Sequence, residues 1–141
     1  MKKLILFILL LSFHNLSAEL VQHSKEIIKD NKTGLLWQDN DHVKNKLQTY
    51  KEALDYCSSL ELDGVKNWQV PGFVELFSII DTKSYNPSIS KTFKNVQAKN
   101  YWTTKLFSHG VNSQAFVIDF KSGAFNRKKM NQKYYVRCYK K

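Results

Sequence analysis

The chain has 141 residues, of which 43% are hydrophobic and 24% charged, and its formal net charge at pH 7 is +10. This length suits one domain, and the sequence has no repeat, low-complexity stretch or Pro/Gly-rich linker that would indicate a repeat array or several linked domains. No apolar stretch approaches the roughly 20 residues that a membrane-spanning helix needs, so we expect no membrane span.

Residues 1–18 have the pattern of a secretory signal peptide. Lys2 and Lys3 form a basic start, residues 4–11 are an unbroken apolar run, and residues 16–18 form a cleavage tripeptide. Cleavage there would leave residues 19–141 as one exported domain. The alternative is a buried N-terminal helix that belongs to the folded protein.

The first elements expected in the exported domain are a hairpin and a helix. Residues 26–29 and 35–38 are short apolar runs on either side of a Gly-ended polar turn, which predicts two paired strands. A helix is then predicted by largely apolar residues that recur at helical spacing: Tyr50, Ala53, Leu54, Cys57 and Leu60. Thr49 and Glu52 form a capping-box pattern at the start of this helix, and Gly64 lies just past its expected end.

A shorter second helix is expected after an extended segment at residues 68–71. The residue before Pro71 is kept out of the α region, and Gly72 can cap a helix over residues 73–80. Its apolar face would consist of Phe73, Leu76, Phe77 and Ile80. Residues 82–99 are polar without clean periodicity, which predicts a long surface loop.

The C-terminal part predicts strands at residues 101–104, 115–120 and 134–139. In the last of these strands, alternation places Cys138 on the core face and Arg137 on the outward face. Because helices come first and antiparallel strands last, we expect an α+β domain with two helices packed on one antiparallel sheet.

Cys57 and Cys138 are the only cysteines, and both are expected on the core faces of their elements. In an exported protein they would form a disulfide that closes a loop of about 80 residues and stabilises the fold by roughly 4.5 kcal/mol. Two free buried thiols are the alternative. A redox-active pair is disfavoured because no Cys-x-x-Cys spacing is present.

Positive charge is concentrated in the second half of the chain. Residues 82–141 contain 13 Lys and Arg and 1 acidic residue, whereas residues 19–81 contain 7 basic and 11 acidic residues. This asymmetry indicates a basic surface for a polyanion, formed by a solvated loop between two strands and by the C-terminus. The candidate ligand-binding residues are Arg127, Lys128, Lys129, Lys133, Arg137, Lys140 and Lys141. The alternative is a solvated basic face without a ligand.

Other kinds of site are not indicated. Residues 39–41 are the only dense cluster of side-chain oxygens, and such a run is more often a turn or a helix lead-in than a metal site. His23, His42 and His109 are isolated, which disfavours zinc binding and acid–base catalysis. We therefore expect no catalytic residue, no metal and no cofactor. The core is expected to take the tryptophans Trp37, Trp68 and Trp102.

Several short motifs follow one another in a characteristic order. They are residues 30–38 (D-x-x-T-G-L-x-W), 52–57 (A-x-x-Y-C), 67–71 (compare D-W-R-L-P), 75–76 with 80–81, 101–104 (compare Y-W-S-S), 117–123 and 136–138. Together they resemble the Legionella collagen-like protein C-terminal domain family over nearly the whole exported domain. Gln69 stands where the family usually has Arg, and Gly72 where it usually has Thr.

This resemblance implies a C-type-lectin-like α+β fold, export from a bacterial cell, and adhesion to sulfated glycans through a basic oligomer. The resulting hypothesis is a periplasmic or secreted, non-catalytic module that binds an anionic polysaccharide or cell-envelope polymer. The alternative is a structural subunit of an envelope assembly, which binds another envelope protein or further copies of itself. A hydrolase without a recognisable motif is the third hypothesis.

Overall fold

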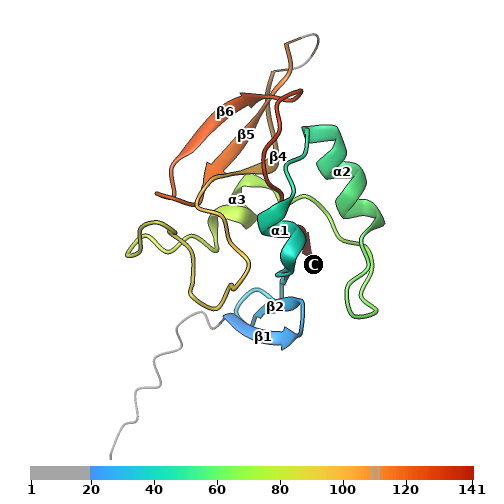
Figure 1. The fold of residues 1–141 in the computed structure, drawn as a ribbon, viewed down its shortest axis with the longest axis vertical. Helices are drawn as coiled ribbons and strands as arrows, with labels where there is room; N and C mark the ends of the chain where they lie inside the picture. The colour runs from blue at the N-terminus through green and yellow to red at the C-terminus, as the bar shows by residue number, and fades with distance from the viewer. Residues whose placement is uncertain (1–19, 109, 111) are drawn as a thin grey trace, which may run out of the picture.

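The computed structural model describes residues 20–108, 110 and 112–141, so the predicted signal peptide at residues 1–18 lies outside the described residues (Figure 1). The strands are β1 (Leu20–Ser24), β2 (Ile27–Asp30), β3 (Leu36–Gln38), β4 (Asn100–Ser108), β5 (Gln114–Asp119), β6 (Phe125–Lys129) and β7 (Tyr139–Lys140). The helices are α1 (Asp41–Asn45), α2 (Tyr50–Ser59) and α3 (Phe73–Phe77). None of these helices has the length and apolar character needed to cross a membrane.

The strands confirm an α+β fold, but they form two antiparallel sheets instead of the single sheet predicted. One sheet has the order β1-β2-β3-β7 and the other the order β4-β5-β6. Figure 1 shows β1 and β2 at the opposite end of the molecule from β4, β5 and β6, with the helices between them. Because Trp37 of β3 pairs with Tyr139 of β7, the last strand of the chain completes the N-terminal sheet.

The predicted hairpin is confirmed as β2 and β3. Ile28 pairs with Trp37, and Gly34 in the turn adopts φ of 77°, a left-handed conformation that glycine adopts without a steric penalty. The run at residues 39–41 is confirmed as a helix lead-in, because Asn40 is the N-cap of α1. A short helix therefore follows the hairpin directly.

The capping box of α2 is also confirmed. The Thr49 hydroxyl accepts a hydrogen bond from the Glu52 backbone N–H at 3.3 Å, and the Glu52 carboxylate accepts one from the Thr49 backbone N–H at 2.7 Å. The helix ends at Ser59, so the prediction that Gly64 marks its end is wrong. Gly64 lies instead in a separate turn, where its φ is 79°.

The second helix and the following loop differ from the prediction. α3 ends at Phe77, earlier than expected, because Ile80 leaves the helix and forms an isolated bridge with Ile89. The segment at residues 82–99 contains no regular strand or helix, but it is not only a surface loop. Ile89 and Phe93 are 2% and 5% exposed, so this segment supplies core side chains.

The last predicted strand is mostly wrong. Only Tyr139 and Lys140 form a strand, while Tyr134 and Tyr135 make isolated bridges to two different partners. Conversely, β6 is a regular strand where a solvated loop was expected between residues 120 and 134. β6 pairs along its whole length with β5, which extends the β4-β5 hairpin by a third strand.

The core confirms the predictions for the tryptophans and the cysteines. Trp37, Trp68 and Trp102 are at most 1% exposed; Trp68 and Trp102 lie in one hydrophobic cluster and Trp37 in a second. Cys57 of α2 and Cys138 form a disulfide, with their Cα atoms 5.6 Å apart. This bond joins the longest helix to the segment that precedes β7.

Candidate functional site

The predicted basic residues do not form one contiguous surface. On β6, Arg127 lies opposite Phe116 of β5, whereas Lys128 lies opposite the buried Ala115 and therefore on the other face of the sheet. The Lys128 ammonium is 5.7 Å from the centre of the Tyr134 ring. Lys129 shares the face of Arg127, so the basic run at residues 127–129 is divided between two faces.

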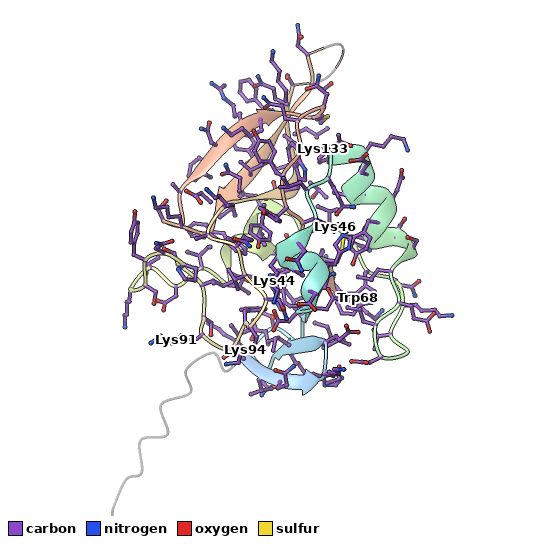
Figure 2. All side chains as sticks on the ribbon, viewed as in Figure 1. Lys44, Lys46, Trp68, Lys91, Lys94 and Lys133 are labelled. Carbon is purple, nitrogen blue, oxygen red and sulfur yellow. A yellow bond between two sulfur atoms is a disulfide. The ribbon has the colours of Figure 1, made fainter. Side chains whose placement is uncertain are left out.

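The remaining predicted lysines lie elsewhere. Figure 2 shows Lys133 beside the start of α2. Lys140 pairs with Leu36 in the other sheet, and Figure 1 shows the C-terminus, where Lys141 lies, well away from β6. The expectation of one positive surface that contains all of these residues is therefore wrong. The structure separates them because the chain crosses the molecule between β6 and β7.

Arg137 is fully buried, which corrects the prediction that it faces outward. Its Nη1 donates to the Gln38 carbonyl oxygen at 2.5 Å and to Asp39 Oδ1 at 3.2 Å. Its Nη2 donates to the Asn95 carbonyl oxygen at 2.6 Å, and the guanidinium lies 4.4 Å from the centre of the Phe93 ring. Arg137 thus joins the end of β3 to the segment at residues 93–95, and it is not available to a ligand.

Burial lowers the pKa of Arg137, and the neighbouring Tyr101 and Asp39 act in the opposite direction. An arginine with this ion pair and these acceptors remains protonated. Asp39 is also held from another side, because its carboxylate accepts the backbone N–H groups of Lys94 and Asn95 at 2.9 and 3.0 Å. The buried pair therefore fixes the position of the loop that contains Lys94.

A row of lysines, most of which the sequence pattern did not indicate as a site, crosses one face of the molecule. Figure 2 shows this lysine row running from the start of α2, over α1, to the segment at residues 82–99. Its members are Lys133, Lys46, Lys44, Lys94 and Lys91. Only Lys133 belongs to the set of residues predicted from the sequence.

Backbone contacts hold the lysine row together. Gln48 and Tyr134 exchange two backbone hydrogen bonds of 2.8 and 2.9 Å, which bring the segment after α1 next to Lys133. At the other end, Asp39, which immediately precedes the α1 cap, binds the backbone of Lys94. The row therefore combines three segments that are distant in the sequence.

The lysines of the row outnumber the acidic residues near them, which are Asp41, Glu52 and Asp81. Lys44 forms an ion pair with Asp41 at 2.9 Å. Glu52 lies close enough to Lys133 for the lysine charge to contribute to lowering the pKa of Glu52. Hydrogen bonds from Thr49 are the main cause of the lowered pKa of Glu52, with Lys133 contributing less. Within the described part of the chain, no ion pair is formed by the other four lysines of the row, Lys46, Lys91, Lys94 and Lys133. The sequence feature that could have indicated part of this row is the lack of acidic residues at 82–99. Lys44 and Lys46 could not be found in this way, because they lie in the half of the chain that has more acidic than basic residues.

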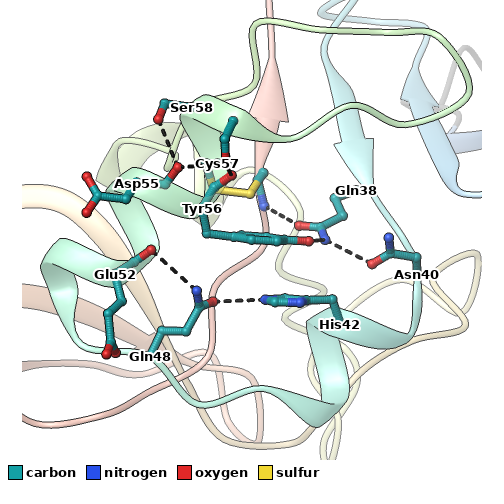
Figure 3. Close-up of a disulfide and its surroundings, with 11 residues drawn as sticks. Gln38, Asn40, His42, Gln48, Glu52, Asp55, Tyr56, Cys57 and Ser58 are labelled. Atoms are coloured by element: carbon teal, nitrogen blue, oxygen red, sulfur yellow. Dashed lines mark hydrogen bonds between the residues drawn. A yellow bond between two sulfur atoms is a disulfide. The ribbon is translucent and has the colours of Figure 1, made fainter.

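A polar network that includes His42 lies beside the disulfide. The His42 ring stacks on the Tyr56 ring with 3.7 Å between centres, and His42 Nε2 lies 3.0 Å from Gln48 Oε1 (Figure 3). The Gln38 amide donates to the Tyr56 hydroxyl oxygen at 2.8 Å. Burial raises the pKa of Tyr56 to about 12. Among the described residues, no group of three or more His, Cys, Asp or Glu side chains is placed to hold a metal ion.

The motifs noted in the sequence occupy the elements described above, from the β2–β3 hairpin to the disulfide. A comparison with known families matches residues 26–140 to the Lcl C-terminal domain. The chain belongs to this family. A search of curated proteins finds no match.

The Lcl C-terminal domain described here keeps its tryptophans buried, so none of them offers a platform for a sugar ring. The large exposed aromatic side chains are instead Phe77, Phe107, Phe125 and Tyr85. Three of these are phenylalanines on α3 and the β4-β5-β6 sheet. The sequence pattern indicated only Phe77, as part of the apolar face of the second helix, and the structure leaves it 41% exposed. The sequence pattern could not place these phenylalanines on a common face, because the segment that contains Phe125 was expected to be a loop and is in fact strand β6.

Proposed function

We propose that this Lcl C-terminal domain is an exported, non-catalytic module that binds an anionic glycan or another anionic polymer of the cell envelope. The observation that carries this proposal is the lysine row, in which the exposed Lys133, Lys46, Lys94 and Lys91 and the half-exposed Lys44 follow one another across one face (Figure 2). A linear polyanion has negative charges repeated along its length, which can pair with successive lysines of the row. The domain is periplasmic or secreted in this proposal, and its fold is of the C-type-lectin-like type.

The energetics of the row favour a polymer over a small anion. A single exposed ion pair contributes about 1 kcal/mol or less, because water and salt screen it. Several pairs made by one polymer chain add up, because each contact after the first is intramolecular. The interaction should weaken strongly with salt, since charges separated by more than about 8 Å are screened at physiological ionic strength.

The disulfide is compatible with the exported part of the proposal. Such bonds form and persist in oxidising compartments, which include the bacterial periplasm and the cell exterior. Cys57 and Cys138 are both 0% exposed, so the bond also stabilises the core beneath the lysine row. The row is attached to this core through α2 and the segment that follows α1.

Retention on a sulfated-polysaccharide column tests the proposal. The parent protein should be retained at physiological salt, and the double substitution Lys46→Glu with Lys94→Glu should elute at clearly lower salt. Lys32→Glu with Lys121→Glu is the matched control, because it changes the net charge equally at exposed positions outside the row. Circular dichroism should show the same fold for all three proteins.

Three results would contradict this assignment. Equal loss of retention in the row variant and the control would show that net charge alone is responsible. Loss of retention only on charge reversal at Arg127, Lys128 and Lys129 would return the site to the basic run predicted from the sequence. A parent protein that is not retained would favour the alternative function, an interaction subunit of an envelope protein assembly.

A further inference from the structure

A group of phenylalanines, three of them exposed and two partly buried, lies on one face of the β4-β5-β6 sheet and on α3. We call this surface the aromatic face, and its residues are Phe73, Phe77, Phe107, Phe116 and Phe125; we include with it the exposed Val74, which follows Phe73 in α3. Phe125 is 59% exposed, Phe107 51%, Phe77 41% and Val74 76%. Large contiguous apolar surfaces are rare on soluble monomers and mark interaction sites.

The rings form one continuous cluster. The centre of the Phe73 ring lies 5.2 Å from that of Phe125, 5.9 Å from Phe77 and 6.2 Å from Phe116. The Phe107 ring extends the cluster, with its centre 6.2 Å from that of Phe116. The exposed side chains therefore present a single surface.

The fold explains why this surface remains open. In β5, Ala115 and Val117 face the core, so Phe116 between them points to the other side of the sheet. That side is covered by α3, which contributes the buried Leu76 but is only 5 residues long. Beyond the reach of α3, the outer part of the sheet has no cover among the described residues. The side chains are thus presented by regular strands, not by a loose loop.

Cations lie directly among the rings. The Lys105 ammonium is 5.7 Å from the centres of both the Phe73 and Phe116 rings, and the Arg127 guanidinium is 4.0 Å from the centre of the Phe107 ring. Lys129 follows Arg127 on the same side of β6. None of these cations is ion-paired among the described residues. The nearest acid on α3 is Glu75, whose carboxylate lies beside Gly72 at the start of the helix.

We propose that the aromatic face docks on the surface of an anionic phospholipid bilayer. In this arrangement the phenylalanines enter the boundary between headgroups and acyl chains, while Lys105, Arg127 and Lys129 contact lipid phosphates. Phenylalanine has no hydroxyl or indole N–H with which to bond the hydroxyls of a sugar, so its exposed surface suits an apolar environment. Amphipathic surfaces that combine aromatic residues with Lys and Arg bind at this depth of the bilayer.

Charge complementarity favours a bilayer over a second copy of the chain. A two-fold dimer through this face would place the same patch against itself. Lys105, Arg127 and Lys129 of one copy would then approach those of the other, with no acid on the face to compensate. An anionic lipid surface provides both apolar volume and negative charge. The inference is independent of the lysine row and adds a second binding surface to the proposed function.

Co-sedimentation with vesicles tests the inference. The parent protein should bind vesicles of phosphatidylcholine with phosphatidylglycerol, and bind vesicles of phosphatidylcholine alone much less. Phe77→Ser with Phe125→Ser should lower the affinity for the anionic vesicles about a hundredfold, or about tenfold for each ring removed. Lys105→Glu with Arg127→Glu should lower it by more than about tenfold, because each cation near an anionic surface contributes to binding.

Matched controls separate this effect from folding and from net charge. Tyr85→Ser removes an aromatic ring that is 67% exposed but lies outside the aromatic face, and it should leave vesicle binding unchanged. A further test variant, Val74→Ser, alters a side chain of the aromatic face that is 76% exposed, so it should lower binding several-fold without affecting the melting temperature. Lys46→Glu with Lys94→Glu should lower the salt concentration at which the protein elutes from the polysaccharide column, while most of the vesicle binding remains.

Three results would overturn the inference. The first is a parent protein that does not bind anionic vesicles at low salt. The second is equal binding by the parent and the phenylalanine variant. The third is concentration-dependent self-association of the parent in analytical ultracentrifugation that Phe125→Ser abolishes, because a second copy would then cover the face. A failure here leaves retention on the polysaccharide column intact, so the two proposals can fail separately.

Discussion

Replacing the buried Arg137 with methionine should destabilise the protein strongly. The substitution preserves much of the side-chain volume but removes every donor of the guanidinium. Three acceptors then lose their partner: the carbonyl oxygens of Gln38 and Asn95, and the Asp39 carboxylate. Asp39 is 3% exposed, so the remaining charge would be left inside the protein.

The expected cost can be estimated from the environment of the pair. Removal of one partner of a buried ion pair costs about 3–5 kcal/mol, because the other charge stays buried and uncompensated. Asp39 keeps the backbone N–H groups of Lys94 and Asn95, which places the expected value towards the lower end of this range. Even about 3 kcal/mol is a large part of the 5–15 kcal/mol by which small domains are stable.

Urea unfolding followed by tryptophan fluorescence measures this cost, because all the tryptophans are buried in the folded protein. Arg127→Met is the matched control: it removes the same charge from an exposed position and should change stability by about 0.5 kcal/mol or less. Adding Asp39→Asn to the Arg137 variant should recover part of the loss, since the uncompensated charge is gone. A cost below about 1 kcal/mol for Arg137→Met, or an equal cost for the control, would refute the buried pair.

Two further predictions concern the core and the polar network. Trp68→Ala should lower the free energy of unfolding by about 3–5 kcal/mol, because the ring is 1% exposed and its indole N–H donates to the Val65 carbonyl oxygen; a melting temperature close to that of the parent would contradict this packing. Because the pKa of Tyr56 is raised from 10.0 to about 12 in the folded protein, its contribution to stability should be complete below pH 10 and lost as the pH rises to 12. Tyr56→Phe should reduce this alkaline loss in unfolding experiments across that range, and an unchanged alkaline profile would show that Tyr56 is not the group responsible.

Family membership and local elements followed from the sequence by itself. The capping box of α2 depends on Thr49 and Glu52, which are close in the chain, and the β2–β3 turn depends on Gly34. Both features depend on residues that are only a few positions apart in the chain, so they can be recognised from the sequence. The buried tryptophans and the paired cysteines were also predictable, because large apolar side chains are mostly buried and because the expectation of export favoured a disulfide between the two cysteines.

Only the tertiary structure decided which residues are exposed. Alternation placed Arg137 on an outward face, but the segment at residues 93–95 covers that face and supplies an acceptor for the guanidinium. The lysine row joins Lys133 to α1 and to Lys94 through contacts between distant segments, and the aromatic face exists because α3 is too short to cover the sheet. A local pattern specifies the direction of a side chain relative to its own strand or helix. Whether another segment covers that side depends on long-range packing, which no local pattern contains.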